Sequence, residues 1–379
     1  MHKPRIHRPA APVGRDAAAA ALETRLRAQR LVTVTGPGGM GKSALAAEVA
    51  YRMAAAGRWA AVGFGDLAAL DDPGLLPHHL ARALRLDGDP ARPQLDALAR
   101  TVGTRPVLLV VDTCERLADA CAEVFARLVA ECPGAHVLAT SRVAPGAPDG
   151  AFPLRPLTLD AATTLFRAEA RQFGAEDIGP GPAREICRLL DGLPLAVRTV
   201  AARLVRQAAA DLLAGLSRPE YVLDLPAPVP GLPERLRTLR GSLRWSLRLC
   251  TPLERLLWAR CSVFPSVFTA HDAGVVCGDE RLPPGALAAA FAGLERHALI
   301  LREREREGMP GPEREGLPGP EPEPGPEPVR TAASPTYPAP GPPFRMPRGT
   351  RAYGRQWLVE LGEERELLRR CLAWSLDHG

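Results

Sequence analysis

The feature that most constrains the fold of this chain is the glycine-rich segment GPGGMGKS at residues 36–43. It fits the pattern G-x-x-x-x-G-K-[ST], with Gly36, Gly41, Lys42 and Ser43 at the fixed positions. The apolar run 31–35 before it has the composition of a buried strand, and the alanine-rich run 43–55 after it favours a helix. A chance match in a glycine-rich turn would not carry these flanks. The order of strand, loop and helix therefore predicts a phosphate-binding loop.

The residue types in the loop suit phosphate chemistry. Glycines have no Cβ, so the backbone can approach a phosphate and turn its N–H groups inward: Gly36, Gly38, Gly39 and Gly41. Lys42 can reach the β- and γ-phosphates of a nucleotide, and Ser43 offers a hydroxyl to Mg²⁺. Lys42 is one of only two lysines, against 46 arginines, so a compact point charge has been kept where a forked guanidinium is a poor replacement.

Composition places the chain among soluble globular proteins of two or three domains, with 379 residues, 46% hydrophobic and 24% charged. No run approaches the ~20 apolar residues of a membrane span, and the N-terminus lacks the apolar core of a signal peptide. A cytoplasmic location without membrane contact is therefore expected. The net charge of +5 is spread along the chain and only weakly favours nucleic-acid binding.

The eight cysteines are scattered and form no C-x-x-C pair. Their neighbours are mostly apolar, so we predict reduced core residues rather than disulfides or metal ligands.

Residues 13–158 alternate strand-like and helix-like runs, as expected of a parallel α/β sheet. The strand-like runs are 31–35, 60–64, 107–112, 136–141 and 152–154, and the helical runs include 76–86 and 118–129. From 159 helical spacing takes over, with an apolar stripe behind Pro194, which suits a first helical turn: Leu193, Val197, Val200 and Leu204.

After residue 229 a proline-bounded segment carries a leucine face and several arginines. The leucines are Leu236, Leu239, Leu243 and Leu247, and the arginines are Arg235, Arg237, Arg240, Arg244 and Arg248. An ordinary amphipathic helix is favoured over a DNA-facing one. Residues 303–343 are rich in proline, glycine and glutamate and poor in apolar residues, so we predict a disordered insertion there. We interpret this insertion as a spacer; the alternative is that it serves as a polyproline ligand for another protein.

Two further strand ends carry candidate site residues. The run RPVLLVVD ends in Asp112, where a carboxylate beside a phosphate loop can hold Mg²⁺ through water. The run HVLATSR ends in Arg142, whose guanidinium could contact a γ-phosphate. A surface arginine at a strand end is the alternative for Arg142.

Taken in order, the motifs resemble the signal-transduction ATPases with numerous domains (STAND). They are VGRD at 13–16, GPGGMGKS, LLVVDTCERL, VLATSR, DGLPLAV at 191–197 and the segment from TLRGSLRW onward. The chain is most similar to the NB-ARC-like core of large bacterial transcriptional regulators of the SARP and LuxR types. This resemblance implies a 1–12 tail, a P-loop NTPase domain at 13–158, a helical domain at 159–228, a winged-helix domain at 229–360 with the insertion 303–343, and a C-terminal helical region from 361 to 379.

The resemblance also implies bound ATP or ADP with Mg²⁺. Gly14 and Arg15 would lie near the base and ribose, and Pro194 would pack on the adenine. Strands at 299–301 and 344–346 would form the wing. Lys42, Asp112, Glu115 and Arg142 would carry slow hydrolysis, with Ser43 and Asp112 at the metal.

The chain departs from the family pattern at two places. Thr113 stands where relatives carry Asn or Asp and cannot act as a base, so Glu115 either orients water or caps the next helix. Pro347 and Gly349, in MPRGTR, are expected to break a helix start.

Two functions follow from these features. The first is an ATP/ADP switch that acts in transcriptional control through a protein partner or self-association, with weak or indirect DNA contact. The second is a regulator that binds DNA through its winged helix and holds nucleotide structurally. Only twelve residues precede VGRD, so two alternatives stay open: output comes from another chain, or this is a shortened member that lacks sensor and DNA-binding domains.

Overall fold

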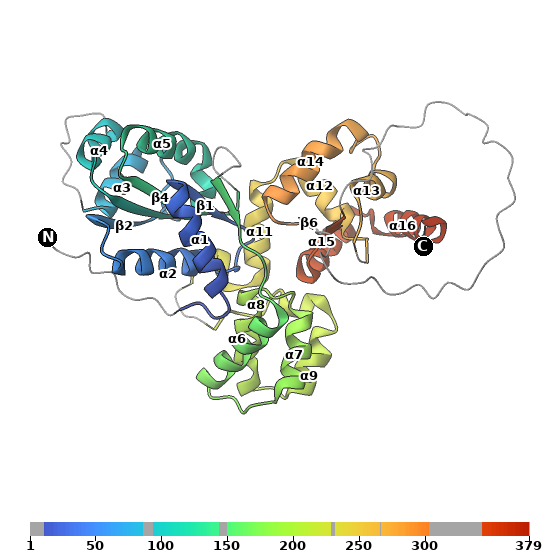
Figure 1. Ribbon diagram of the computed structural model, residues 1–379. Helices are drawn as coiled ribbons and strands as arrows, with labels where there is room; N and C mark the ends of the chain where they lie inside the picture. The colour runs from blue at the N-terminus through green and yellow to red at the C-terminus, as the bar shows by residue number, and fades with distance from the viewer. Residues whose placement is uncertain are drawn as a thin grey trace, which may run out of the picture.

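The computed structural model describes residues 11–85, 94–143, 150–228, 232–265, 267–302 and 343–378. It has three parts, an α/β part, a lobe of short helices and a mainly helical C-terminal part (Figure 1). Helix α11 (Leu239–Leu249) runs between the α/β part and the rest of the C-terminal part. The predicted insertion lies outside the described residues, apart from residue 343.

The α/β part is built on a parallel five-stranded sheet in the order β2-β3-β4-β1-β5. The strands are β1 (Leu31–Thr35), β2 (Ala61–Asp66), β3 (Val107–Asp112), β4 (Ala135–Ser141) and β5 (Ala151–Pro153). The five predicted strands are confirmed, with shifts of at most two residues. Strand β4 separates β1 from β3, so the ends of all three strands meet near the glycine loop.

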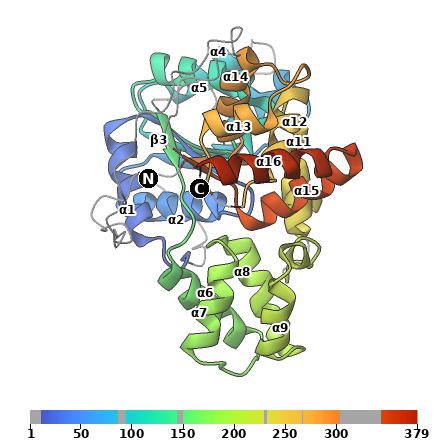
Figure 2. The ribbon, with the colours of Figure 1, turned by 90° about the vertical axis from the view of Figure 1, so that its right-hand side faces the viewer.

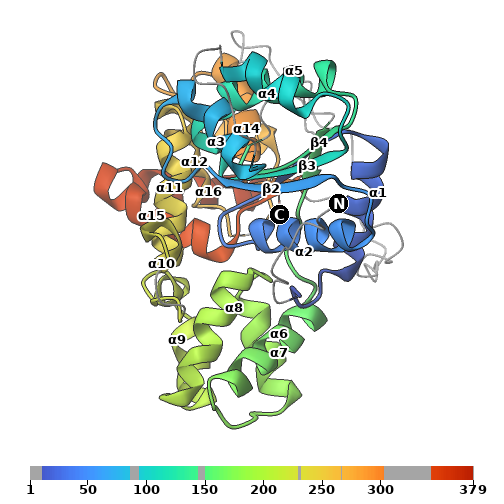
Figure 3. The same cartoon turned by 90° about the vertical axis from the view of Figure 1, so that its left-hand side faces the viewer.

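Helices cover both faces of this sheet, as Figure 3 shows. Helices α1 (Asp16–Ala28) and α2 (Lys42–Ala55) bury leucine, valine and alanine side chains against one face. Helices α3 (Leu76–Ala83), α4 (Gln94–Val102) and α5 (Ala118–Glu131) cover the other. Alternate residues of β3 explain this, because Leu108 and Val110 pack in the first cluster and Leu109 in the second. The result is the α/β P-loop NTPase fold that the sequence predicts.

The helical lobe follows and is seen below the sheet in Figure 2. It contains α6 (Leu159–Gln172), α7 (Pro180–Leu189), α8 (Pro194–Ala201) and α9 (Ala209–Leu216). Pro194 occupies the first turn of α8, as predicted, and Val197 and Val200 are fully buried.

The C-terminal part begins with α10 (Glu234–Arg237) and α11, followed by α12 (Pro252–Cys261), α13 (Ala270–Cys277) and α14 (Pro284–Arg296). Strands β6 (Leu301–Arg302) and β7 (Phe344–Arg345) pair antiparallel, and Phe344 also bridges to Phe268. The pairing joins the two segments expected to form a wing. Helices α15 (Arg348–Leu361) and α16 (Glu364–His378) end the described chain.

The expected break at the start of α15 is wrong. Pro347 is the N-cap of this helix, a position where the missing N–H is not needed. Gly349 lies in the first turn, and a Cβ there would stand 2.8 Å from Cδ2 of Leu239. The glycine therefore lets α15 approach α11 closely instead of interrupting the helix.

The helical lobe and the C-terminal part share one hydrophobic cluster, which runs from Leu157 to Cys371. Leu239, Leu243 and Leu247 are buried in it, so α11 is an amphipathic helix, as the sequence predicts.

Asp191 adds a polar link between the helical lobe and the C-terminal part, because its carboxylate accepts hydrogen bonds from Arg345 Nη1 at 2.9 Å and from Arg348 N at 2.7 Å. All eight cysteines are buried, as expected of core residues, and none is paired in a disulfide. Within the described ranges, none of the helices is both long and apolar enough to cross a membrane.

Candidate functional site

A pocket of about 290 Å³ opens where the glycine loop meets the helical lobe and the C-terminal part. It is lined from all three: by the loop and strand ends of the α/β part, by the start of α8, and by the segment that contains α10. Its lining includes Gly38, Gly39, Gly41, Lys42, Ser43, Asp112, Thr113, Glu115, Thr140, Arg142, Pro194, Leu195, Arg198, Arg235 and Leu236. Most of the predicted site residues therefore lie around one space.

The glycine loop has the conformation that its composition predicts. Gly39 and Gly41 have φ angles of 78° and 89°, in the left-handed region that favours glycine. Lys42 begins α2, and its Nζ donates to the backbone oxygens of Gly36 at 2.8 Å and Pro37 at 3.0 Å. Loss of surrounding water, and next the positive charge of Arg142, lower the pKa of Lys42 to about 8. The ammonium group therefore lies in a confined, cation-rich space, which favours an anionic ligand.

Ser43 and Asp112 come together at the same end of the sheet. Ser43 Oγ donates to Asp112 Oδ1 at 2.8 Å, and the Thr140 hydroxyl donates to the same oxygen. A hydroxyl beside a carboxylate supplies the hard oxygen ligands that Mg²⁺ prefers. The donor set therefore fits the predicted magnesium site.

Arg142 lies at the end of β4, where the sequence places it, but its side chain is fully engaged by α11. It donates through Nη1 to Ser242 O at 2.7 Å and to the Ser246 hydroxyl, and through Nη2 to Ser242 Oγ at 3.4 Å. Nε lies 3.4 Å from Glu115 Oε1. Arg142 is 3% exposed, so it joins the phosphate loop to α11 rather than pointing freely into the pocket.

Glu115 does not cap a following helix through its side chain. It is buried, and Oε1 accepts a hydrogen bond from Trp245 Nε1 of α11 at 3.3 Å in addition to facing Arg142. Thr113, two residues earlier, has a φ of 64° and accepts at Oγ1 from Arg235 Nη2 at 3.3 Å. Thus α10 contacts Thr113, which stands where a base was expected, and α11 contacts Glu115.

The helical lobe and the C-terminal part contact the glycine loop at Gly39 and Gly38, respectively. A Cβ on Gly38 would lie 2.1 Å from Ser242 Oγ and 2.3 Å from Arg142 Nη2, and a Cβ on Gly39 would lie 2.6 Å from Leu195 Cβ. Leu195 N also donates to Gly39 O at 3.1 Å. The absence of a Cβ at these two glycines therefore allows close contact with α8 and α11.

Gly14 and Arg15 are not among the residues that line this pocket. Arg15 is buried and donates to the backbone oxygens of Arg155 at 2.6 Å and Met40 at 2.9 Å. Gly14 lies against Ala161 and Leu157. In this arrangement the pair supports the glycine loop and its junction with α6, and a contact with base or ribose stays a prediction.

Sequence reasoning missed Trp245, Ser242, Ser246 and the position of Arg235 in the pocket. Ser242 and Ser246 lie 100 and 104 residues from Arg142, and nothing local marks either serine as a partner. The usable signal was the arginine spacing on 235–248, which indicates a basic face without indicating its target.

Comparison with known proteins agrees with this geometry. Residues 10–144 match the family model described as Novel STAND NTPase 1. The protein named "Uncharacterized protein Rv0894" of Mycobacterium tuberculosis is 34% identical over 304 residues, which are 78% of this chain and 76% of that protein. The chain belongs to the same family as that protein, and its residues 10–144 are similar to the STAND NTPases. A second relative in that organism, named "Putative HTH-type transcriptional regulator Rv0890c", is 34% identical over 69% of this chain. The chain spans only 30% of that regulator's length.

Among solved structures, the Walker-type ATPase PABY2304 of Pyrococcus abyssi has a TM-score of 0.56 at 14% identity. The similarity covers 92% of this chain and 98% of the archaeal one. At this identity the likeness concerns the fold, and it extends across all three parts.

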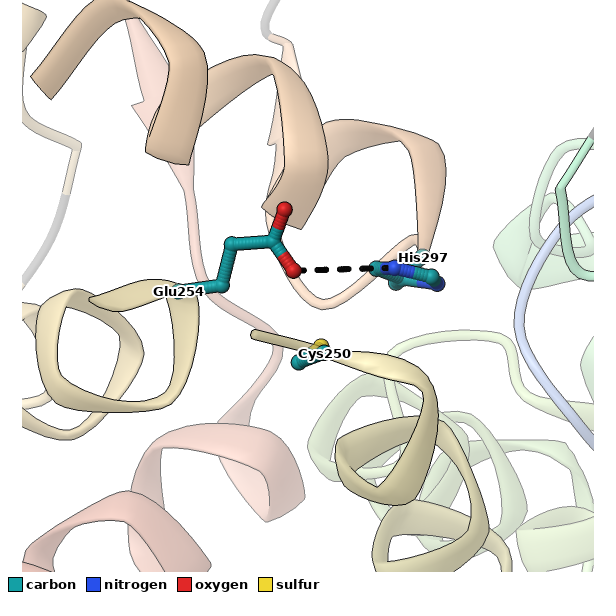
Figure 4. Close-up of side chains that lie close together, drawn as sticks. All are labelled: Cys250, Glu254 and His297. Carbon is teal, nitrogen blue, oxygen red and sulfur yellow. Dashed lines mark ion pairs between the residues drawn. The ribbon is translucent and has the colours of Figure 1, made fainter. Parts of the chain in front are cut away.

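A second group of potential metal ligands lies away from the pocket: Cys250, Glu254 and His297 (Figure 4). Their ligand atoms lie within 4.8 Å of one another, and all three residues are buried. Glu254 Oε2 accepts from Thr251 N at 2.8 Å in a capping box that begins α12, and lies 3.8 Å from His297 Nε2. Burial raises the pKa of Cys250 to about 12 and lowers that of His297. Because Glu254 is already committed to the capping box that begins α12, the group fits a packing junction between α12 and α14.

Proposed function

We propose that this chain is an ATP/ADP-binding switch of the regulator type, which hydrolyses ATP slowly and acts in transcriptional control. The observation that carries the proposal is the junction at the glycine loop, where α8 touches Gly39 and α11 touches Gly38. A ligand seated in this loop would contact the α/β part and lie against both other parts. Its chemistry would therefore bias their arrangement, provided that ATP and ADP make different contacts.

Different residues of the pocket would bind the phosphates, the Mg²⁺ and the adenine. Lys42 would leave the carbonyl oxygens of Gly36 and Pro37 for the phosphates, and loop N–H groups would hold the phosphate nearest α2. Ser43 and Asp112 would hold Mg²⁺, which neutralises phosphate charge. Pro194, which lines the pocket at the start of α8, would pack on the adenine.

Arg142 could serve the switch in either of two ways. In this arrangement its N–H groups face α11 and Glu115, so a contact with the γ-phosphate requires it to leave Ser242 and Ser246. Holding α11 and reading a γ-phosphate are therefore alternatives for this side chain.

Hydrolysis would be slow because Thr113 supplies no base. Glu115 lines the pocket while Oε1 is held by Trp245. We expect the other carboxylate oxygen to orient water. Slow turnover suits a switch, because each nucleotide state then lasts long enough to be read by a partner.

Regulation through a partner protein or self-association in the cytoplasm is part of the proposal. The relative named as an HTH-type transcriptional regulator supports it, since 69% of this chain aligns there. DNA binding by a winged helix formed from α12–α14 and β6–β7 is the alternative. It receives less support from the arginine-rich segment, because Arg240 pairs with Asp224 and Arg235 lies in the pocket. Tight, sequence-selective binding of the purified chain to duplex DNA at physiological salt would favour the alternative.

Lys42→Ala tests the nucleotide site. Loss of the ammonium should weaken Mg-ATP binding by about 2–3 kcal/mol, the range for a hydrogen-bonding charged group. Fluorescent-nucleotide titration measures this, with circular dichroism to verify folding. Unchanged affinity in a folded variant would exclude the proposed site.

A further inference from the structure

Arg235 is a cation that the C-terminal part places in the pocket. It belongs to the single-turn helix α10, far along the chain from the glycine loop, and it lines the same pocket as Lys42. Its positive charge is also among the influences that lower the pKa values of Lys42 and Arg142, after desolvation. Arg235 therefore lies within electrostatic reach of both.

The contacts of Arg235 are weaker than those of Arg142. Arg142 has two hydrogen bonds of 2.7 Å or less to α11 and faces a carboxylate. Arg235 donates to the neutral Thr113 hydroxyl at a long 3.3 Å, and its guanidinium lies 5.7 Å from the centre of the Trp245 ring. A neutral hydroxyl is a poor substitute for an anion as acceptor. Of the two arginines, Arg235 would therefore lose the weaker contacts on binding a phosphate oxygen.

The charges of the pocket lead to the same residue. Glu115 faces Arg142, and Asp112 accepts hydrogen bonds from the hydroxyls of Ser43 and Thr140. Arg198 also lines the pocket, but its Nε lies 3.0 Å from Glu169 Oε1. Lys42 and Arg235 are then left to balance phosphate charge. Lys42 begins α2 beside the loop, whereas Arg235 lies beyond Thr113 at the strand end where a terminal phosphate would sit.

We propose that Arg235 binds the γ-phosphate of a nucleoside triphosphate and makes the position of α10 and α11 depend on that group. This inference rests on the proposed function and adds the residue through which the C-terminal part distinguishes ATP from ADP. Arg235 exchanges the Thr113 hydroxyl for a phosphate oxygen, which moves its guanidinium relative to the Trp245 ring. Arg142 keeps α11 docked, so that α10 presents Arg235 to the pocket.

The experiment compares Arg235→Ala, Arg235→Lys and the control Arg248→Ala, which removes an exposed arginine of α11. Each full-length protein is titrated with Mg-ADP and with Mg-ATPγS. Arg235→Ala should weaken ATPγS binding about 10- to 100-fold, as for a lost charged hydrogen bond, and change ADP affinity less than twofold. Arg235→Lys should recover part of the loss, and Arg248→Ala should match the unmodified chain.

Trp245 gives a second readout that a merely structural role would not move. Because Arg235 lies over its ring, ATPγS should change Trp245 fluorescence, defined by the difference from Trp245→Phe, whereas ADP should change it little. Arg235→Ala should abolish the response. Equal weakening of both nucleotides, or no effect on ATPγS, would overturn the inference while leaving the proposed function intact. An unmodified chain that binds neither nucleotide would refute the proposed function itself.

Discussion

At the scale of single residues, Lys42 shows how a strong motif acquires its chemistry from its surroundings. The sequence identifies the lysine, but its lowered pKa follows from burial and from Arg142, which comes from another strand. The nearby carbonyl oxygens of Gly36 and Pro37 hold the ammonium until an anion takes their place.

This pKa predicts how nucleotide binding depends on pH. Below pH 8, Lys42 is charged in the nucleotide-free chain; above it the amine is neutral, so binding must take up a proton. Affinity for Mg-ADP should therefore be steady up to about pH 8 and then fall with rising pH, by up to about tenfold per unit. Titrations between pH 7 and 9.5 measure this, and Lys42→Ala should remove the dependence. A fall in affinity toward lower pH would contradict it.

Glu115 is the second residue-scale test. Glu115→Gln keeps an oxygen for Trp245 but removes the charge that would orient water. Steady-state phosphate release should fall by about 100-fold or more, because loss of a general base costs about 10²–10⁴-fold. Mg-ADP affinity should stay within about twofold. Full activity in the Gln variant would show that another group positions water, and turnover of many per second in the unmodified chain would contradict the slow switch.

At the scale of elements, local sequence predicted what local physics determines. The bounds of β1 and β3 were predicted without error, because a buried apolar run ends at a glycine or a charged residue in each case. Pro347 shows the limit of this reasoning. As an isolated signal it predicts a break, yet in the structure it caps α15, and Gly349 acts through Leu239 more than 100 residues earlier. The hydrogen bonds between Arg142 and α11 depend on tertiary packing in the same way. The phosphate loop could therefore be predicted from local sequence, whereas the packing of α11 against it could not.

Asp191 joins the helical lobe to β7 and α15, and its φ of 51° suits Asn equally well. In Asp191→Asn, one of the two donors, Arg345 or the Arg348 N–H, would face the amide NH₂. The free energy of unfolding should fall by about 1–3 kcal/mol, measured as a shift in the denaturation midpoint. The matched control is Asp160→Asn, whose exposed ion pair with Arg184 contributes about 1 kcal/mol or less. Equal shifts in both variants would show that the Asp191 link contributes no more than a surface pair.

At the scale of the whole molecule, three parts close on one loop, and each contributes a different contact. The α/β part supplies Lys42, Ser43 and Asp112; the lobe supplies Pro194 and Leu195; and the C-terminal part supplies Ser242, Trp245 and Arg235. The phosphate-loop motif and the strand-end pattern predicted the first set, and family resemblance predicted Pro194. The last set depends on how this chain packs α10 and α11, and it is the set that would distinguish nucleotides.

The central claim is that the nucleotide in this pocket sets the state of α10 and α11, and hydrogen exchange of residues 234–249 tests it most directly. The chain is compared with saturating Mg-ADP and with saturating Mg-ATPγS, and Lys42→Ala serves as the control that binds neither well. These amides should exchange more slowly with ATPγS than with ADP, because Arg235 gains a phosphate contact, and Lys42→Ala should show no such difference. Identical exchange with the two nucleotides, both shown to be bound, would contradict it.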